Sequence, residues 1–383
     1  MLTFAASGVA LLALLLTLRF RARARTTATT FLRLSSGESS AAQFLAACPS
    51  LAAYAPPLLL PISGHVSTLF HVFFRRSPGL AFSRELVSLP DGGEVALDFR
   101  RPILPGDRVV LLLHGLTGGS YERYLQWQIV ALEGAGAACV VLNARGCGGT
   151  RLASPRTFSA AWTEDVRAAV RLLGARAGVG GRVCAMGWSL GAGILIKYVC
   201  EEGEAGRQDL FAAVAAAPSI DFFRSRDRLE RPLARRVYNL PMARALHRYL
   251  RLHLPALRGV PGFKEGEALS APTLRGVDAA AICPLHGFDS VEHYYAAAST
   301  THRLKHVAVP LLVLAARDDP ICDVGGLEEA APSASGWVTA VVTEEGGHVA
   351  WPLPRPGGWL FPGRGRSWEN KVAVEWLQHV GGV

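Results

Sequence analysis

The stretch that decides the fold is RVCAMGWSLGAGILIKY, residues 182–198. It begins with an apolar run, residues 183–186, that is typical of a buried strand, and from Leu190 onward it has helical character. Between the two lies Gly187-Trp188-Ser189-Leu190-Gly191. A serine held exposed on a tight strand-to-helix turn needs small residues on either side, because the turn crowds the backbone. Ser189 is therefore the candidate nucleophile, and Gly187 and Gly191 form its turn.

Further apolar runs alternate with helical stretches along the chain. Two short alternating segments, residues 84–89 and 94–99, flank Asp91-Gly92-Gly93 and predict a hairpin. Strands that are apolar throughout and alternate with helices indicate a parallel sheet covered on both faces. The sequence thus predicts an α/β fold with a mostly parallel sheet of eight strands. The other six strands are expected at residues 109–113, 137–142, 183–186, 211–217, 309–315 and 338–342, and the helices at 121–134, 162–173 and 190–200.

Two polar residues at strand ends complete a candidate site. Asp318 follows the strand at 309–315, and His348 follows the last strand. The carboxyl ends of parallel strands meet at one edge of the sheet, where ligands bind. The chain order Ser, Asp, His is that of α/β-hydrolases. His348 is the expected general base, and a carboxylate is expected to orient it. Asp318 is preferred to Asp319 because it comes first after the strand, whereas Asp319 abuts Pro320 in the turn.

An acyl-transfer reaction also needs backbone donors for its oxyanion. One is expected to be the amide of Leu190, directly after the nucleophile, and the other the amide of Leu116 in the turn that begins at His114. His114 itself is expected to brace this turn through hydrogen bonds. No cofactor is expected. No Cys or His spacing suggests a metal site, and the seven scattered cysteines are expected to be reduced core residues.

The N-terminal residues predict a membrane segment. Residues 2–18 carry no charge, and arginines follow at 19, 21, 23 and 25. A signal anchor is favoured, while a transit peptide and a cleaved signal remain alternatives. The expected divisions are an anchor with its basic flank at 1–25, a lead-in segment at 26–80 and the α/β-hydrolase domain at 81–383. The lead-in segment either packs on the domain or lies at the membrane interface.

A second segment departs from the alternation. Residues 221–305 contain many Arg and His residues and no clear strand, so they are expected to form an inserted lid. The formal net charge of +9 is compatible with an anionic lipid surface. Because the arginines are scattered and no base-reading module accompanies them, nucleic acid is not an expected partner. Nothing in the sequence indicates an oligomeric state.

Several stretches carry a resemblance to a known family. The chain resembles the α/β-hydrolase domain-containing protein 1, 2 and 3 group, the type 4 family of the AB hydrolase superfamily, from about Leu86 to the C-terminus. One departure is Ala350-Trp351, where the group has glycine and phenylalanine, and Trp351 is expected to narrow the acyl site. The matching stretches are HGLTGGSYERY from His114, NARGCGGT from Asn143, TEDVRAAV from Thr163, GWSLGAGILIKY from Gly187, FDSVEHYYAAAS from Phe288, AARDDP from Ala315 and GGHVAW from Gly346.

The resemblance implies a membrane-anchored serine hydrolase that cleaves carboxylic esters of lipids, by phospholipase A1-type cleavage or as a monoacylglycerol lipase. The alternatives are a carboxylesterase acting on small soluble esters, an acyltransferase, and a non-catalytic ligand-binding protein. The expected location is a single-pass anchor in the endoplasmic reticulum or another endomembrane. The arginine cluster places the catalytic domain in the cytosol, whereas the resemblance implies a lumenal domain, and the two remain open.

Overall fold

The computed structural model describes residues 30–33, 46–52, 54–57, 63–357 and 361–383. Its central sheet has nine strands in the order β1-β9-β8-β7-β6-β4-β5-β3-β2. The strands β4 to β9 are parallel to one another, while β1, β2 and β3 run antiparallel to their neighbours. The strands are β1 Thr30–Arg33, β2 Ser83–Ser88, β3 Glu94–Phe99, β4 Arg108–Leu113, β5 Ala138–Asn143, β6 Arg182–Trp188, β7 Ala212–Ala216, β8 Leu311–Ala316 and β9 Val338–Thr343.

Strands β2 to β9 are the eight predicted strands, so the predicted mostly parallel sheet is confirmed. The ninth strand, β1, pairs antiparallel with β9 at the edge of the sheet and was not expected. It is only four residues long, which is too short for an alternating pattern to stand out from its surroundings. The predicted hairpin is β2 and β3, whose register pairs Ser88 with Glu94.

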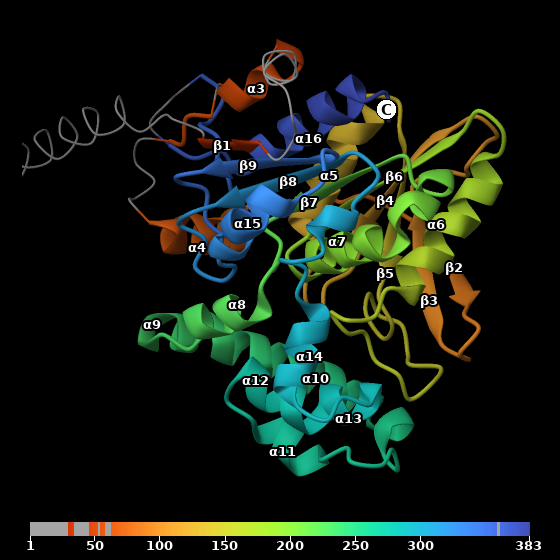
Figure 1. Ribbon diagram of the computed structural model, residues 1–383, viewed down its shortest axis with the longest axis vertical. Coiled ribbons are helices and arrows are strands. Elements are labelled where there is room, and N and C mark those ends of the chain that lie inside the picture. Colours follow the sequence, from red (N-terminus) through yellow and green to blue (C-terminus); the bar gives the residue numbers. More distant parts are fainter. Residues whose placement is uncertain (1–29, 34–45, 53, 58–62, 358–360) are drawn as a thin grey trace, which may run out of the picture.

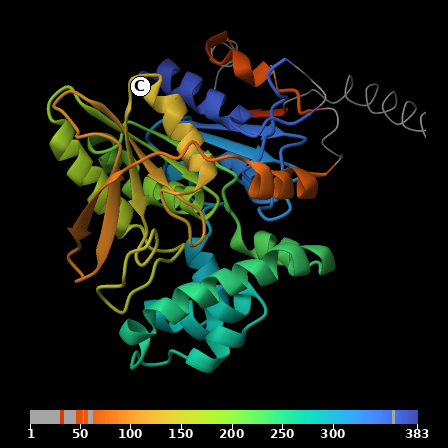
Figure 2. The ribbon, with the colours of Figure 1, turned by 180° about the vertical axis from the view of Figure 1, so that it is seen from behind.

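Both faces of the sheet are buried because successive side chains of each strand point to opposite sides. In β4, for example, Val109 and Leu111 join the core under one layer of helices, and Val110 and Leu112 join the core under the other. The first layer contains α6 (Glu164–Ala177), α7 (Leu190–Glu202) and α15 (Gly325–Ala330). The second contains α5 (Arg123–Glu133) and α16 (Trp368–His379). Figures 1 and 2 show the two layers on either side of the sheet.

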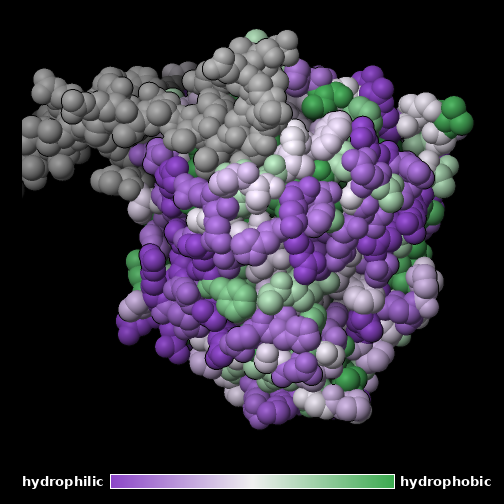
Figure 3. All heavy atoms as spheres, viewed as in Figure 1, coloured by the Kyte–Doolittle hydropathy of each residue, from purple (hydrophilic) through white to green (hydrophobic). Residues whose placement is uncertain are grey.

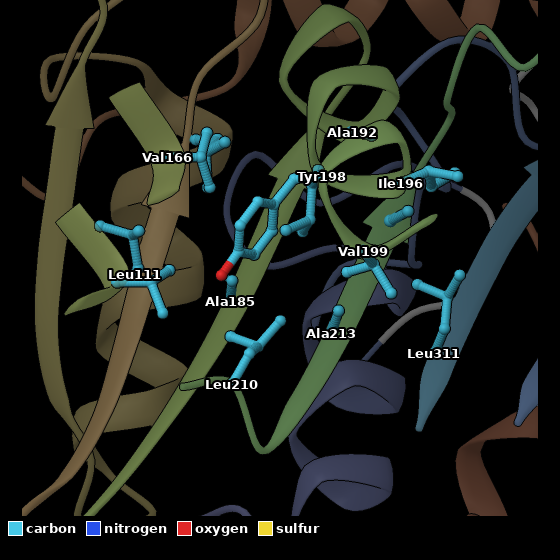
Figure 4. Close-up of a cluster of buried hydrophobic side chains, with 14 of the residues drawn as sticks. Leu111, Val166, Ala185, Ala192, Ile196, Tyr198, Val199, Leu210, Ala213 and Leu311 are labelled. Atoms are coloured by element: carbon cyan, nitrogen blue, oxygen red, sulfur yellow. The ribbon is translucent and has the colours of Figure 1, made fainter. Parts of the chain in front are cut away.

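Helix α7, which begins at the candidate nucleophile, lies close to the sheet because the strands beneath it carry small residues. Ala185 of β6 and Ala213 of β7 are fully buried under the helix. Figure 4 shows Ile196, Tyr198 and Val199 of α7 packed over them. This dense packing fixes the first turn of α7, and with it the position of Ser189, relative to the strand ends.

The predicted lid segment, residues 221–305, lies wholly between β7 and β8 and contains helices and no strand. We call it the cap. In Figures 1 and 2 it forms a separate layer below the sheet. Its core joins Leu246 and Leu250 to Phe158 of the sheet domain, which holds the cap against the strand ends. The cap helices are α8 Phe222–Leu229, α9 Pro232–Ala234, α10 Leu240–Leu257, α11 Glu265–Ser270, α12 Leu274–Val277, α13 Cys283–His286 and α14 Val291–Ala298.

The lead-in segment contributes α3 (Pro49–Ala52) and α4 (Gly64–Phe74). Cys48 and Leu51 are buried against α16, so this part of the segment packs on the domain. The predicted anchor at residues 2–18 lies outside the described residues. Among the residues that the structure describes, no helix has the length and apolar character needed to cross a membrane. All seven cysteines are buried and unpaired, as predicted.

Candidate active site

The candidate nucleophile lies on the predicted turn. Ser189 joins β6 directly to α7 and has a backbone φ of 53° and ψ of −119°. Such a conformation costs a non-glycine residue about 1–3 kcal/mol and persists only where its surroundings impose it. A Cβ on Gly187 would lie 2.6 Å from the carbonyl oxygen of Gly191, and a Cβ on Gly191 would lie 2.5 Å from that of His114. Both glycines are therefore required by close backbone approach, as the sequence predicts.

Ser189, His348 and an aspartate form a continuous hydrogen-bonded chain. Nε2 of His348 lies 2.8 Å from Oγ of Ser189. On the other side of the ring, Nδ1 of His348 lies 2.8 Å from Oδ2 of Asp319. With Nδ1 protonated, the imidazole donates to the carboxylate and presents a free lone pair to the serine hydroxyl. This is the arrangement that a nucleophile, its base and the orienting acid require.

The prediction that Asp318 orients His348 is wrong. Asp319 occupies that position, and its other oxygen, Oδ1, accepts hydrogen bonds from the amides of Ile321 (2.7 Å) and Cys322 (2.9 Å). In the sequence, the turn at Pro320 was the reason to prefer Asp318. In the structure, the same turn fixes the carboxylate of Asp319. Neighbouring residues in an extended loop project in different directions, so a shift of one position exchanges the two roles.

Asp318 serves the same loop in another way. Its Oδ1 accepts a hydrogen bond of 2.8 Å from the amide of Gly347, the residue before His348. Burial raises the pKa of the Asp318 carboxyl to about 6, with the nearby negative charge of Asp319 as a smaller contribution. Asp318 therefore holds the backbone of the histidine loop, while Asp319 holds the ring.

Helix α4 supplies a contact that the sequence did not predict. The backbone amide of His348 donates to Oγ1 of Thr68 (2.8 Å), and this hydroxyl donates to the carbonyl of Gly64 (2.6 Å). A Cβ on Gly64 would lie 1.8 Å from the carbonyl oxygen of Asp318. Glycine at the start of α4 is therefore required for the helix to reach the active-site loops.

The predicted oxyanion donors, Leu116 and Leu190, both line the cavity that contains Ser189. In the described part of the chain, neither amide donates a hydrogen bond to another protein group. Their role in holding an oxyanion stays a prediction. His114 braces the turn as expected, since Nε2 accepts from the amide of Ala144 (3.1 Å) and Nδ1 lies 2.6 Å from the carbonyl oxygen of Gly115. Burial lowers its pKa to about 4, so His114 is neutral.

The cavity lies between the sheet domain and the cap and encloses about 120 Å³. Trp351, which was expected to narrow it, does not line it. The indole is fully buried beneath the histidine loop, where Nε1 donates to Oγ1 of Thr343 (2.9 Å). The lining is mainly apolar and includes Leu229, Met242, Leu246 and Leu274 of the cap. In the space-filling view of Figure 3, hydrophobic residues gather near α8 and α14, and hydrophilic residues cover most of this face of the cap.

Among the described residues, one group of side chains brings potential metal ligands together. Asp319, Cys322 and His348 place their ligand atoms within 4.8 Å of one another. Both ring nitrogens of His348 are already engaged by Ser189 and Asp319. Burial raises the pKa of the Cys322 thiol well above its usual value, so the thiolate that a metal requires is disfavoured. The hydrogen bonds account for the positions of His348 and Asp319.

Comparisons with known proteins give the family of the chain. Residues 110–361 match the model of the Alpha/beta hydrolase family. The embryogenesis-associated protein EMB8 of Picea glauca is 30% identical, covering 82% of this chain and 70% of the relative. Mouse phospholipase ABHD3 is 30% identical over 74% of this chain and 69% of its own length. The monoacylglycerol lipase of Saccharomyces cerevisiae is 29% identical over 78% and 76%. By its fold, its nucleophile turn and these matches, the chain belongs to the alpha/beta hydrolase family.

Proposed function

We propose that the protein is a serine hydrolase that cleaves carboxylic esters of lipids, as a phospholipase A1-type enzyme or a monoacylglycerol lipase. The observation that carries the proposal is the chain of two 2.8 Å contacts from Asp319 through His348 to Ser189. This chain ends at a largely apolar cavity that Ser189 itself lines. The relatives named as a phospholipase and a monoacylglycerol lipase support lipid esters as the substrate class.

The reaction follows from the geometry. His348 takes the proton of the Ser189 hydroxyl as its oxygen attacks the ester carbonyl carbon, and Asp319 stabilises the imidazolium that forms. The amides of Leu116 and Leu190 receive the oxyanion. His348 then returns the proton to the leaving alcohol, and the carbon–oxygen bond breaks to leave an acyl-enzyme. Water, deprotonated by His348, hydrolyses this ester and releases the fatty acid.

The test is labelling with a fluorophosphonate probe together with turnover of lipid esters, comparing the wild type with Ser189→Ala. The wild type is expected to label and to release fatty acid, and the variant to do neither. A folded wild type that neither labels nor turns over any ester contradicts the proposal and favours a non-catalytic binding protein. A panel of esters of increasing acyl length separates a lipid hydrolase from a carboxylesterase, because only the former gains kcat/KM as the chain lengthens.

We also propose that the enzyme works at an anionic membrane surface. The apolar residues 2–18 and the arginines that follow support an anchor. Within the described residues, α4 exposes Phe73 and Phe74, and the neighbouring cap exposes Leu233 and several arginines that form no ion pair there. Leu69 of α4 packs against the cap cluster of Leu229, Ala234 and Tyr238, so α4 lies beside this part of the cap. These arginines are Arg231, Arg236, Arg244, Arg248 and Arg251.

The membrane proposal is tested with vesicles of neutral or partly anionic lipid. The full-length protein is expected to bind both, and the variant Arg244→Gln/Arg248→Gln/Arg251→Gln to lose part of its preference for the anionic vesicles. This preference should weaken as salt rises, because exposed charges are screened. Equal binding by the variant and the wild type at low salt contradicts a role for these arginines. Extraction of cell membranes with carbonate, and protease protection in sealed microsomes, report the anchor and the side of the catalytic domain.

A further inference from the structure

Asp278 is a buried acidic residue of the cap that the proposed reaction does not use. It follows α12 directly, is 9% exposed, and lines the same cavity as Ser189. One carboxyl oxygen is engaged, because the hydroxyl of Tyr295 on α14 donates to Oδ2 (2.9 Å). The other oxygen, Oδ1, accepts no hydrogen bond from any described residue, yet it is not among the polar atoms sealed off inside the protein. This oxygen therefore faces the cavity.

The remaining charged groups of the cavity wall are already paired. Arg226 lies 2.7 Å from Asp227, and Arg275 lies 2.9 Å from Glu292. Glu230 accepts from Nδ2 of Asn239 (3.2 Å). No Arg, Lys or His among the described residues forms an ion pair with Asp278. Burial raises the pKa of its carboxyl to about 7. A buried carboxyl with unused hydrogen-bonding capacity is costly, and proteins retain such groups mainly where a ligand completes them.

We propose that Asp278 is a specificity-determining residue that accepts a hydrogen bond from a hydroxyl group of the substrate through Oδ1. The proposal rests on the ester hydrolase function given above and adds the chemical class of the ligand. The hydroxyl belongs either to the alcohol part of the ester, as in a partial ester of glycerol, or to the acyl chain. In both cases the enzyme favours a hydroxylated ester over a plain alkyl ester of the same acyl length.

A neutral hydroxyl fits this site better than a cationic group does. The charged residues of the cavity wall are Arg226, Arg275, Glu230 and Asp278, so the wall offers no excess of negative charge that would favour a cation. The apolar residues around Asp278, such as Leu274 and Ile282, suit the alkyl part of a lipid. A site built to bond a hydroxyl discriminates strongly against an analogue that lacks it, because the protein group is then left buried and unpaired.

The experiment compares three esters with one acyl length: ethyl octanoate, monooctanoylglycerol, and ethyl octanoate with a terminal hydroxyl. The readout is the ratio of kcat/KM for each hydroxylated ester to kcat/KM for ethyl octanoate. The wild type is expected to prefer one of the two hydroxylated esters, and the identity of that ester locates the hydroxyl. Asp278→Leu, which has a similar shape without the carboxyl, is expected to lower this ratio roughly tenfold.

The matched control is Tyr295→Phe. It removes the internal hydrogen bond to Asp278 but keeps the carboxyl, so the ratio is expected to persist. A ratio that is the same in Asp278→Leu and in the wild type shows that Asp278 serves only to join α14 to the preceding cap segment, and overturns the proposal. The absence of any preference in the wild type overturns it without a variant. If the wild type hydrolyses none of the esters and Ser189 does not label, the hydrolase function itself fails.

Discussion

Thr68 and His348 lie 280 residues apart in the chain, and the Thr68 hydroxyl accepts the hydrogen bond that the His348 amide donates. The same hydroxyl donates to the carbonyl of Gly64 at the start of α4. The lead-in segment is therefore part of the active-site scaffold. It fixes the backbone of the candidate base, His348, from outside the sheet, where neither β9 nor the loop after it supplies such a contact to the His348 amide.

This relationship predicts that Thr68→Val slows catalysis although Thr68 is remote from the substrate. The substitution keeps the shape and removes the hydroxyl, so the histidine loop keeps the bond to Asp318 but loses the one to Thr68, and the Nε2–Oγ contact loosens. We expect kcat to fall roughly tenfold, since small displacements of catalytic groups have effects of this order or larger. Thr68→Ser, which keeps the hydroxyl, is the control and should retain most of the activity. Equal losses in the two variants would point to packing instead.

The two neighbouring aspartates give a second prediction. Asp319→Asn should lower kcat on the order of 10³–10⁴-fold. The amide favours the wrong tautomer of His348, and it has no negative charge to stabilise the imidazolium. Asp318→Asn should cost less than about tenfold, since its side-chain oxygen still accepts from the amide of Gly347. Steady-state kinetics with a soluble ester measure both. The reverse order of the two effects would restore Asp318 as the orienting acid.

These aspartates also show where inference from the sequence stops. The strands and their ends are predictable because apolar runs alternate with helices, and Ser189 and His348 follow from chain order. The choice between Asp318 and Asp319 depends on which way each side chain projects from a turn. That direction is set by two amide hydrogen bonds after Pro320, from Ile321 and Cys322.

Contacts between remote segments could not be predicted from the sequence for a related reason. Thr68, Gly64 and Asp278 acquire their roles only through tertiary packing, which leaves no periodic pattern in the chain. The cap illustrates this well. The sequence marks its residues as an insertion only because they lack the strand pattern. The expectation that Trp351 narrows the acyl site is wrong for the same reason. Its position after His348 in the sequence does not determine on which side of the loop the indole packs.

The crowded turn at Ser189 predicts that two Gly→Ala substitutions have opposite effects on the free energy of unfolding. Gly191→Ala places a methyl group 2.5 Å from the carbonyl oxygen of His114 and should destabilise the fold by at least about 3 kcal/mol or prevent its expression. Gly174→Ala within α6 meets only a methyl carbon of Val183 at 3.9 Å and should stabilise it by about 0.5–1 kcal/mol. Chemical denaturation of the two variants measures this. A tolerated Gly191→Ala with full labelling of Ser189 would contradict the observed crowding.

A buried ion pair beneath the histidine loop gives a fourth prediction. Arg75 and Glu369 lie 3.6 Å apart with almost no exposure, and Nη2 of Arg75 also donates to the carbonyl of Ala350 (3.4 Å). Glu369→Gln leaves the arginine without its counter-charge and should lower the free energy of unfolding by about 3–5 kcal/mol. Arg75→Met combined with Glu369→Gln removes the stranded charge and should recover part of that loss. A double variant less stable than Glu369→Gln alone would show that Arg75 acts mainly through Ala350.

The last prediction concerns pH and Asp278. Its carboxyl has a pKa of about 7 in the folded protein against an ordinary value near 4, so between these values the folded state binds a proton that the unfolded state has released. Stability from this group is therefore fully present below about pH 4 and is lost as pH rises toward 7. The groups around it are Tyr294 and Tyr295 of α14, Cys283 of α13, Arg275 of α12, and Arg226 and Glu230 near α8.

Asp278→Asn cannot ionise and still accepts the bond from Tyr295, so it removes this pH dependence while preserving the contact. The variant should gain stability relative to the wild type as pH rises from 4 to 8, by up to about 4 kcal/mol at 1.4 kcal/mol for each pKa unit. Chemical denaturation at a series of pH values measures the difference. Tyr295→Phe serves as the control, because it keeps the carboxyl and should keep the loss of stability with rising pH. A constant difference between Asp278→Asn and the wild type across this range would mean that Asp278 has an ordinary pKa and is solvated in the cavity, since only a desolvated carboxyl carries this penalty.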